Sequence, residues 1–154
     1  MARSQSASQT AGPYVHIGCT PNFAGLENMY GGHELGAEMF SSDAVGAWMT
    51  VTGQIFDGDG IPVTDAMLEF WQADASGRYA PHGGSEGWGR RAVDAEEARY
   101  KLRTILPAGL GCEAPHIKVW IVARGINLGL HTRIYFDDQD NWQDPLLAAI
   151  DDPV

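Results

Sequence analysis

The sequence predicts an all-β domain, an antiparallel β-sandwich with an N-terminal arm and little helix. Short apolar segments alternate with polar residues at a period of two, which is typical of half-buried strands. Turn residues separate these segments at the short intervals of a sandwich. The 154 residues include 19 glycines and 8 prolines, which interrupt every long helical pattern. With 44% apolar and 19% charged residues, the chain can bury one core.

The first 47 residues are predicted to form an arm and loops. Residues 1–12 are polar and rich in serine, alanine and glutamine, which indicates a flexible arm. Gly12 and Pro13 then predict an extended bend. Residues 26–40 contain helix-forming residues, but three glycines interrupt them, so we expect a loop with room for one short helix. Residues 48–154 are assigned to the sandwich domain.

The strand pattern begins at Trp48, where apolar and threonine residues alternate as far as Ile55. Residues 57–60, with the sequence Asp-Gly-Asp-Gly, predict a hairpin turn. A calcium loop of the EF-hand type is disfavoured, because Ile61 and Pro62 occupy the positions that need an Asp or Asn and a glycine. The acidic turn is therefore interpreted as a structural one.

Four further strands and one short helix are predicted along the chain. The strands cover residues 63–73, 100–105, 117–121 and 130–136, and the short helix covers residues 143–150. In the strand at 117–121, the isoleucine and valine residues share one face, while Lys118 and Trp120 share the other. The glycine-rich segment at 83–89 is expected to be a mobile surface loop, because no Gly-Lys-Ser/Thr follows it.

Charge and cysteine content exclude several classes of function. The net charge of −10 disfavours nucleic acid as a partner, and an anionic substrate would need a local arginine. The two cysteines, Cys19 and Cys112, have no zinc-site spacing and are expected to be reduced thiols in a cytoplasmic protein. Residues 1–12 contain no secretory signal, and the apolar run at 119–123 is too short to span a membrane.

His116 and Lys118 raise the question of a metal site. Side chains two residues apart on a strand point the same way, so positions 116 and 118 could face one metal ion. A protonated lysine has no lone pair to donate, so a metal ion bound by His116 would have no second ligand at position 118. None of the five histidines has an acid two residues later, which disfavours an iron(II) site of two histidines and one carboxylate.

Arg124 precedes Gly125 at the end of a predicted strand and has two interpretations. It is either a surface arginine on a turn or a receiver for a ligand carboxylate, which the planar guanidinium can bind with two parallel donors. The residue pattern alone leaves both interpretations open.

Taken together, several motifs resemble the intradiol ring-cleavage dioxygenases, from about Ser8 to the C-terminus. Within that family they are most similar to the alpha subunits of heteromeric members. The motifs lie at 8–14 (Ser-Gln-Thr-Ala-Gly-Pro-Tyr), 57–58, 62–66, 69–74 (Glu-Phe-Trp-Gln-Ala-Asp), 104–107, 114–117 (Ala-Pro-His-Ile) and 123–138. The resemblance implies an intradiol-type sandwich in an obligate hetero-oligomer with a homologous beta subunit. That subunit would hold Fe(III) through two tyrosines and two histidines and use O2 to open the ring of a small aromatic carboxylate.

Compared residue by residue, the resemblance implies that this chain holds no iron and contributes no catalytic residue. His116 matches the first histidine ligand and would be a lone relic, while Lys118 replaces the second. No tyrosine occurs between Pro107 and His116, where the family has a tyrosine ligand. The segment with Thr10, Gly12, Pro13 and Tyr14 matches the wall of the partner's substrate pocket. Arg124 matches an arginine that shapes the electrostatics of that pocket.

Two alternatives and one departure accompany this interpretation. The chain could be a free-standing intradiol dioxygenase with an unusual metal shell, or a non-enzymatic sandwich that only binds or scaffolds. The family pattern continues through further strands beyond the position of Val154. We therefore expect the sandwich of residues 48–154 to be truncated at its C-terminus, as a fragment or through a shortened gene.

Overall fold

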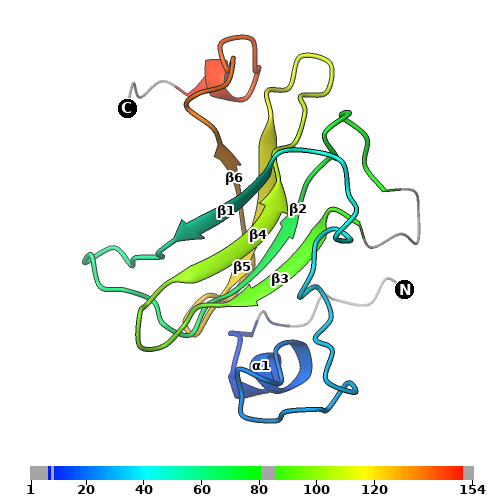
Figure 1. The fold of residues 1–154 in the computed structure, drawn as a ribbon. Coiled ribbons are helices and arrows are strands. Elements are labelled where there is room, and N and C mark those ends of the chain that lie inside the picture. The colour runs from blue at the N-terminus through cyan, green and yellow to red at the C-terminus, as the bar shows by residue number, and fades with distance from the viewer. Residues whose placement is uncertain (1–6, 8, 81–85, 151–154) are drawn as a thin grey trace, which may run out of the picture.

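Two antiparallel sheets make up the molecule in the computed structural model, which describes residues 7, 9–80 and 86–150. The smaller sheet pairs β1 (Trp48–Gly53) with β4 (Tyr100–Ile105). The larger sheet has the order β3 (Trp88–Ala92), β2 (Met67–Trp71), β5 (His116–Val122) and β6 (Leu130–Tyr135). Figure 1 shows the two sheets with helix α1 (Pro13–Cys19) at one end and the C-terminal segment at the other. The predicted sandwich with little helix is confirmed.

The core lies between the inner faces of the two sheets. Leu102 and Ile105 of β4 are buried against Leu68, Phe70 and Ile117 of the larger sheet. Leu68 and Phe70 of β2, and Ile117 and Val119 of β5, alternate as the period of two predicts, while Ile105 is an additional buried residue at the end of β4. The alternate residues of β2, β5 and β6 consequently lie on the outer face, where Trp71 pairs with Lys118, and Lys118 with Arg133.

The predicted loop at 83–89 is wrong at its C-terminal end, where β3 begins at Trp88. Gly89 is buried in this strand, and a Cβ atom there would lie 2.5 Å from Cγ of Met39. The sequence of β3 does not show the alternation of apolar and polar residues that marks a strand, because Arg90 and Arg91 lie on opposite faces. The Arg90 Nε donates to Glu69 at 3.0 Å, so pairing of charges replaces apolar burial on this edge strand. Residues 81–85 lie outside the described residues, as do most of residues 1–8.

A second difference concerns Pro13, which begins α1 instead of continuing an extended bend. Gly12 is extended, with φ −124° and ψ −174°, and is the N-cap of the helix. Proline suits the first helical position because its fixed φ is helical and its missing N–H is not needed there. The bend is therefore one residue long, and the seven-residue helix follows at once.

The other elements agree with the predicted order; β4 also has the predicted bounds, while the remaining elements differ in length. The strand predicted at 63–73 is limited to β2, because the Val63 N–H donates instead to the Ile55 carbonyl across the acidic turn. That turn is confirmed, since the Asp57 carboxylate accepts bonds from the N–H groups of Asp59 and Ile61. The helix predicted at 143–150 is a short 3-10 helix, η1 (Leu147–Ala149). Within the described residues, no helix is long and apolar enough to cross a membrane.

Candidate functional site

The outer face of β5 carries the two residues that the sequence singled out for a metal. His116 is buried, and its Nδ1 lies 2.8 Å from the Ala114 carbonyl oxygen, so Nδ1 carries the proton and donates it. Its Nε2 is buried and has no hydrogen-bond partner in the described part of the chain. One imidazole nitrogen is therefore available at this position.

Lys118 follows on the same face and contacts the aromatic ring of Tyr79. Its Nζ lies 4.9 Å from the centroid of the Tyr79 ring, within the range of a cation–π contact. Tyr79 in turn stacks on Trp71, with 6.0 Å between ring centroids and 10° between planes. In the described ranges no carboxylate lies within 4.0 Å of the Lys118 ammonium. Lys118 thus presents an ammonium where the family pattern has a ligand nitrogen.

These residues do not fit ferric iron, which prefers anionic oxygen and neutral nitrogen ligands. Burial raises the pKa of Tyr135, and this effect is larger than the opposing effect of Arg133. The neutral phenol is therefore favoured over a phenolate. No group of three His, Cys, Asp or Glu side chains in the described residues could hold a metal ion. His116 alone cannot retain a metal ion, so the described residues of this chain do not form an iron site.

Asp144 organises the polar residues beside this face. Its carboxylate accepts bonds from the N–H groups of Ala114, Leu146 and Leu147, at 3.0, 2.8 and 3.3 Å. Burial raises the pKa of Asp144, but these bonds outweigh burial and the pKa is lowered. Arg133 lies 3.9 Å from Asp144 and 3.1 Å from Glu113. The network fixes β6, the start of β5 and the C-terminal turn to one another.

The residues predicted to form a pocket wall lie beside Arg124, which follows the C-terminal end of β5, whereas His116 begins that strand. The Gly125 N–H donates to Thr10 Oγ1 at 2.7 Å, which joins segments 115 residues apart. Arg124 Nε lies 3.5 Å from Asp65 Oδ2, and 83% of the Arg124 side chain is exposed. His16 of α1 lies 3.0 Å from the Asp65 carbonyl oxygen. The structure therefore brings the N-terminal segment to the turn that carries Arg124.

Gly12, Pro13 and Tyr14 extend this cluster from Thr10 into the first turn of α1. The Val15 N–H donates to the Gly12 carbonyl at 3.0 Å, and the Tyr14 side chain is 85% exposed. The cluster therefore presents an exposed surface at Tyr14 and Arg124. Sequence reasoning missed His16 and Asp65 as the residues that hold it, although Asp65 lies inside one of the recognised motifs.

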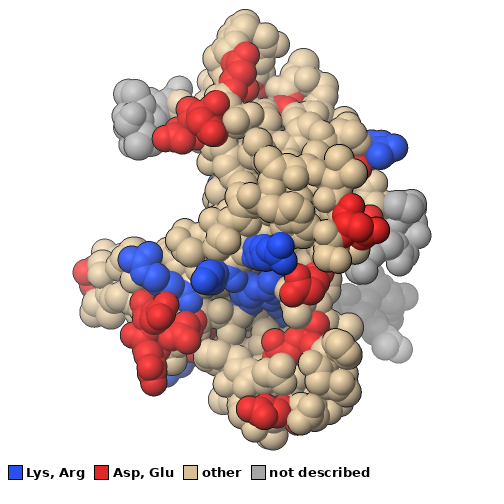
Figure 2. Space-filling model, in the orientation of Figure 1, with Lys and Arg blue, Asp and Glu red and all other residues tan. Residues whose placement is uncertain are grey.

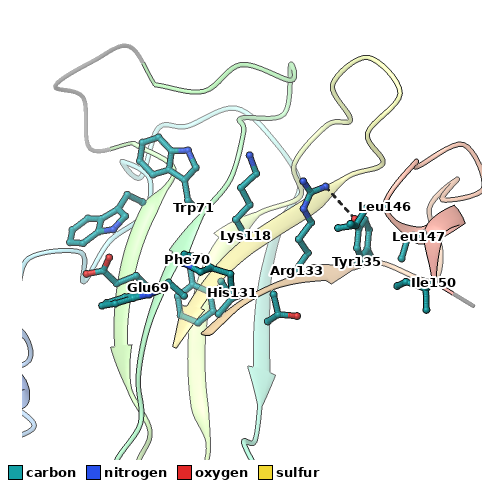
Figure 3. Close-up of a pocket in the computed structure, with 14 residues that line it drawn as sticks. Glu69, Phe70, Trp71, Lys118, His131, Arg133, Tyr135, Leu146, Leu147 and Ile150 are labelled. Atoms are coloured by element: carbon teal, nitrogen blue, oxygen red, sulfur yellow. Dashed lines mark hydrogen bonds between the residues drawn. The ribbon is translucent and has the colours of Figure 1, made fainter. Parts of the chain in front are cut away.

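A cavity that the sequence did not predict lies over the outer face of the larger sheet (Figure 3). It has a volume of about 780 Å³. Its lining is mainly aromatic and aliphatic, with Lys118 and Arg133 as cations and Glu69 as the carboxylate. In Figure 3, Trp71, Lys118 and Arg133 project from neighbouring strands on the same side of the sheet. The sequence signals of this surface are the alternation of Lys118 with Trp120 and of His131 with Arg133, which do not show that the two strands lie side by side.

Positive charge is gathered locally in spite of the net charge of −10. Figure 2 shows a band of Lys and Arg across the middle of one face, with acidic side chains around it. β4 carries two exposed cations, Lys101 and Arg103, and Arg103 lies 4.3 Å over the ring of Trp48. Neither cation has a carboxylate within 4.0 Å in the part of the chain that is described.

The known proteins that are similar to this chain are dioxygenases or their subunits. A family model described as "Dioxygenase" matches residues 20–154. The chain is 41% identical to the protocatechuate 3,4-dioxygenase alpha chain of Pseudomonas putida, over 97% of this chain and 79% of that one. It is 37% identical to the alpha chain from Burkholderia cepacia, over 95% and 78%. The beta chain from Burkholderia cepacia is 31% identical over 74% of this chain and 52% of its own length.

Solved structures agree with the fold. The dioxygenase domain of a dioxygenase carbohydrate-binding protein fusion from Streptomyces sp. SirexAA-E gives a TM-score of 0.60 at 32% identity, over 67% of this chain and 65% of that one. Catechol 1,2-dioxygenase from Pseudomonas arvilla C-1 gives 0.60 at 26% identity, over 69% and 42%. The chain thus spans less than two thirds of these two structures, and more than three quarters of the two alpha chains.

Proposed function

This chain belongs to the intradiol ring-cleavage dioxygenase family, and we propose that it is the iron-free alpha subunit of a protocatechuate 3,4-dioxygenase. In the assembled enzyme, O2-dependent cleavage of protocatechuate to carboxy-cis,cis-muconate takes place in the site of a homologous beta subunit that holds Fe(III). The observation that carries the proposal is the bond from the Gly125 N–H to Thr10 Oγ1, which supports a continuous surface beside Arg124 that the beta subunit would complete as a pocket.

Arg124 is proposed to bind the carboxylate of the substrate and to balance its charge. Its guanidinium is mostly exposed and has one ion pair, with Asp65 at 3.5 Å. Exposed pairs of this kind contribute little, about 0–1 kcal/mol, so the guanidinium can turn to a ligand at small cost. In a chain with a net charge of −10, such a cation is needed to attract an anionic substrate. Its role is positioning and charge compensation.

The arm and loop region, residues 1–47, is proposed to contact the beta subunit. Its side chains include exposed apolar residues that no described segment covers, and the most exposed are Val45 at 87% and Tyr14 at 85%. The others are Phe23, Leu26, Met29, Tyr30 and Leu35. Clusters of exposed aromatic side chains are typical of protein interfaces. The free thiols of Cys19 and Cys112 are in keeping with a cytoplasmic enzyme.

The test is Arg124→Ala in the enzyme assembled from this chain and its beta subunit. Loss of a charge-assisted contact to the substrate predicts a kcat/KM lower by about 10- to 100-fold, with the iron content and the visible absorption band unchanged. Arg78→Ala is a matched control, because Arg78 is 79% exposed and lies 3.4 Å from Asp74. Arg124→Lys should recover part of the activity.

Two results would contradict the proposal. Loss of iron in Arg124→Ala would mean that the residue supports the metal site or assembly and not the substrate. Failure of this chain to form a stable complex with any beta-type chain would favour a scaffold function instead.

A further inference from the structure

The cavity over the larger sheet has no role in the proposed function and has the dimensions of a small-molecule site. Its volume of about 780 Å³ lies within the range of roughly 300–1,000 Å³ of such sites. The floor is the outer face of β2, β5 and β6, and the residues Leu146, Leu147 and Ile150 form one side. The sheet and the C-terminal segment therefore define its shape.

Pairing across the strands places two rows of side chains on this floor. Trp71, Lys118 and Arg133 form one row, because Trp71 pairs with Lys118 and Lys118 pairs with Arg133. In the next row Trp120 lies between Glu69 and His131. Trp120 is held close to the chain at Gly129, where a Cβ atom would overlap the indole. Lys118 therefore has one indole beside it on the neighbouring strand, that of Trp71, and one two residues along its own strand, that of Trp120.

The charged groups of the lining differ in how completely they are paired. Glu69 accepts a bond from Arg90 Nε at 3.0 Å and a second from Arg90 Nη2. Arg133 is paired with Glu113 and, at 3.9 Å, with Asp144. Lys118 is half-buried and makes a cation–π contact with the Tyr79 ring, with no carboxylate within 4.0 Å in the described ranges. An ammonium partly withdrawn from water into an apolar lining favours an anion beside it.

From these contacts we propose that the cavity binds a small planar aromatic monocarboxylate without a metal ion. The carboxylate lies against the Lys118 ammonium, and the aromatic ring packs on the indole faces of Trp71 and Trp120. Flat rings match indole faces better than aliphatic chains of the same size do, and the cation gives the preference for an acid over its neutral analogue. The site uses only residues of this chain, so it does not depend on the proposed function.

Binding is measured by equilibrium dialysis of labelled benzoate against the assembled complex. Benzoate is chosen because it has no adjacent hydroxyl groups with which to chelate iron. We expect one benzoate site per copy of this chain that leaves the visible absorption of the partner's iron unchanged. Lys118→Gln should weaken this site by about tenfold or more, since a hydrogen bond to a charged group is lost. Lys101→Gln, which removes an exposed lysine of the other sheet, should have no effect.

The neutral amide provides an independent readout in the unaltered protein. Benzamide should bind at least about tenfold more weakly than benzoate if the Lys118 charge selects the ligand. Equal binding of the two, or unchanged benzoate binding in Lys118→Gln, would overturn the proposal. If Lys118→Gln does not assemble, Lys118→Arg retains the charge and the ratio of benzoate to benzamide still decides. Loss of turnover in Arg124→Ala tests the proposed function separately and does not affect this site.

Discussion

The surface around Arg124 and the face around Lys118 contain similar residue types in different surroundings. Arg124 has one carboxylate partner and 83% of its side chain exposed, whereas Arg133 has two carboxylates nearby and 21% exposed. An exposed pair can be exchanged for a ligand or another chain at little cost. A paired network that is withdrawn from water fixes the shape of the chain instead. The two regions are therefore suited to different tasks: Arg124 to completing a surface, and the Asp144 network to supporting a cavity.

The largest expected effect is on stability and comes from Asp144→Ala. The change leaves three backbone N–H groups without their acceptor and Arg133 with one carboxylate fewer. We expect a loss of about 3 kcal/mol in the free energy of unfolding. Urea unfolding of the complex at fixed protein concentration measures it.

Asp65→Ala is the matched change on the exposed surface and should cost less than about 1 kcal/mol. Equal costs for the two substitutions would remove the contrast between the regions.

The pH dependence of stability should differ between the unaltered protein and Asp144→Asn. Because the folded-state pKa of Asp144 is lowered from its ordinary value of 3.8, its contribution is present above that value and is lost as the pH falls through the lower folded pKa. The difference in unfolding free energy should therefore be constant above about pH 5 and shrink below about pH 4. Urea titrations from above about pH 5 to below about pH 4 measure it, and a difference that grows on acidification would contradict the assignment.

The same contrast explains which features the sequence could predict. The alternation in β4 and β5 is visible in the sequence because one face of each strand is apolar and buried. β3 was missed because Arg90 and Arg91 are held by a carboxylate and by carbonyl oxygens of distant segments. The helix at Pro13 was missed because proline is compatible with both a bend and a first helical turn.

The candidate sites show a similar limit. Thr10 and Arg124 were selected from motifs, and the structure joins them through Gly125. The cavity depends on the register of β2, β5 and β6, which aligns Trp71 with Lys118 and Arg133. Register is set by tertiary pairing between segments far apart in the chain, so no local pattern could have predicted the cavity.

A smaller effect is expected from Thr10→Val, which removes the acceptor of the Gly125 N–H. Loss of one neutral hydrogen bond, worth about 1 kcal/mol, should lower kcat/KM of the assembled enzyme by about threefold to tenfold. The cause is displacement of the turn that carries Arg124. Thr10→Ser keeps the hydroxyl and should retain the activity. If Thr10→Val and Thr10→Ser have equal activity, the bond does not position Arg124.

The smallest expected effect is that of Arg124→Ala on stability, which separates support of the fold from support of function. Arg124 makes one ion pair, at 3.5 Å, from a side chain that is mostly in water. Such a pair is screened by solvent, so its loss should change the free energy of unfolding by less than about 0.5 kcal/mol. The same substitution is expected to have a large effect on turnover. Urea unfolding and kinetics on one preparation measure both quantities. A stability loss near that of Asp144→Ala would show that Arg124 belongs to the supporting structure and would end the distinction between the two regions.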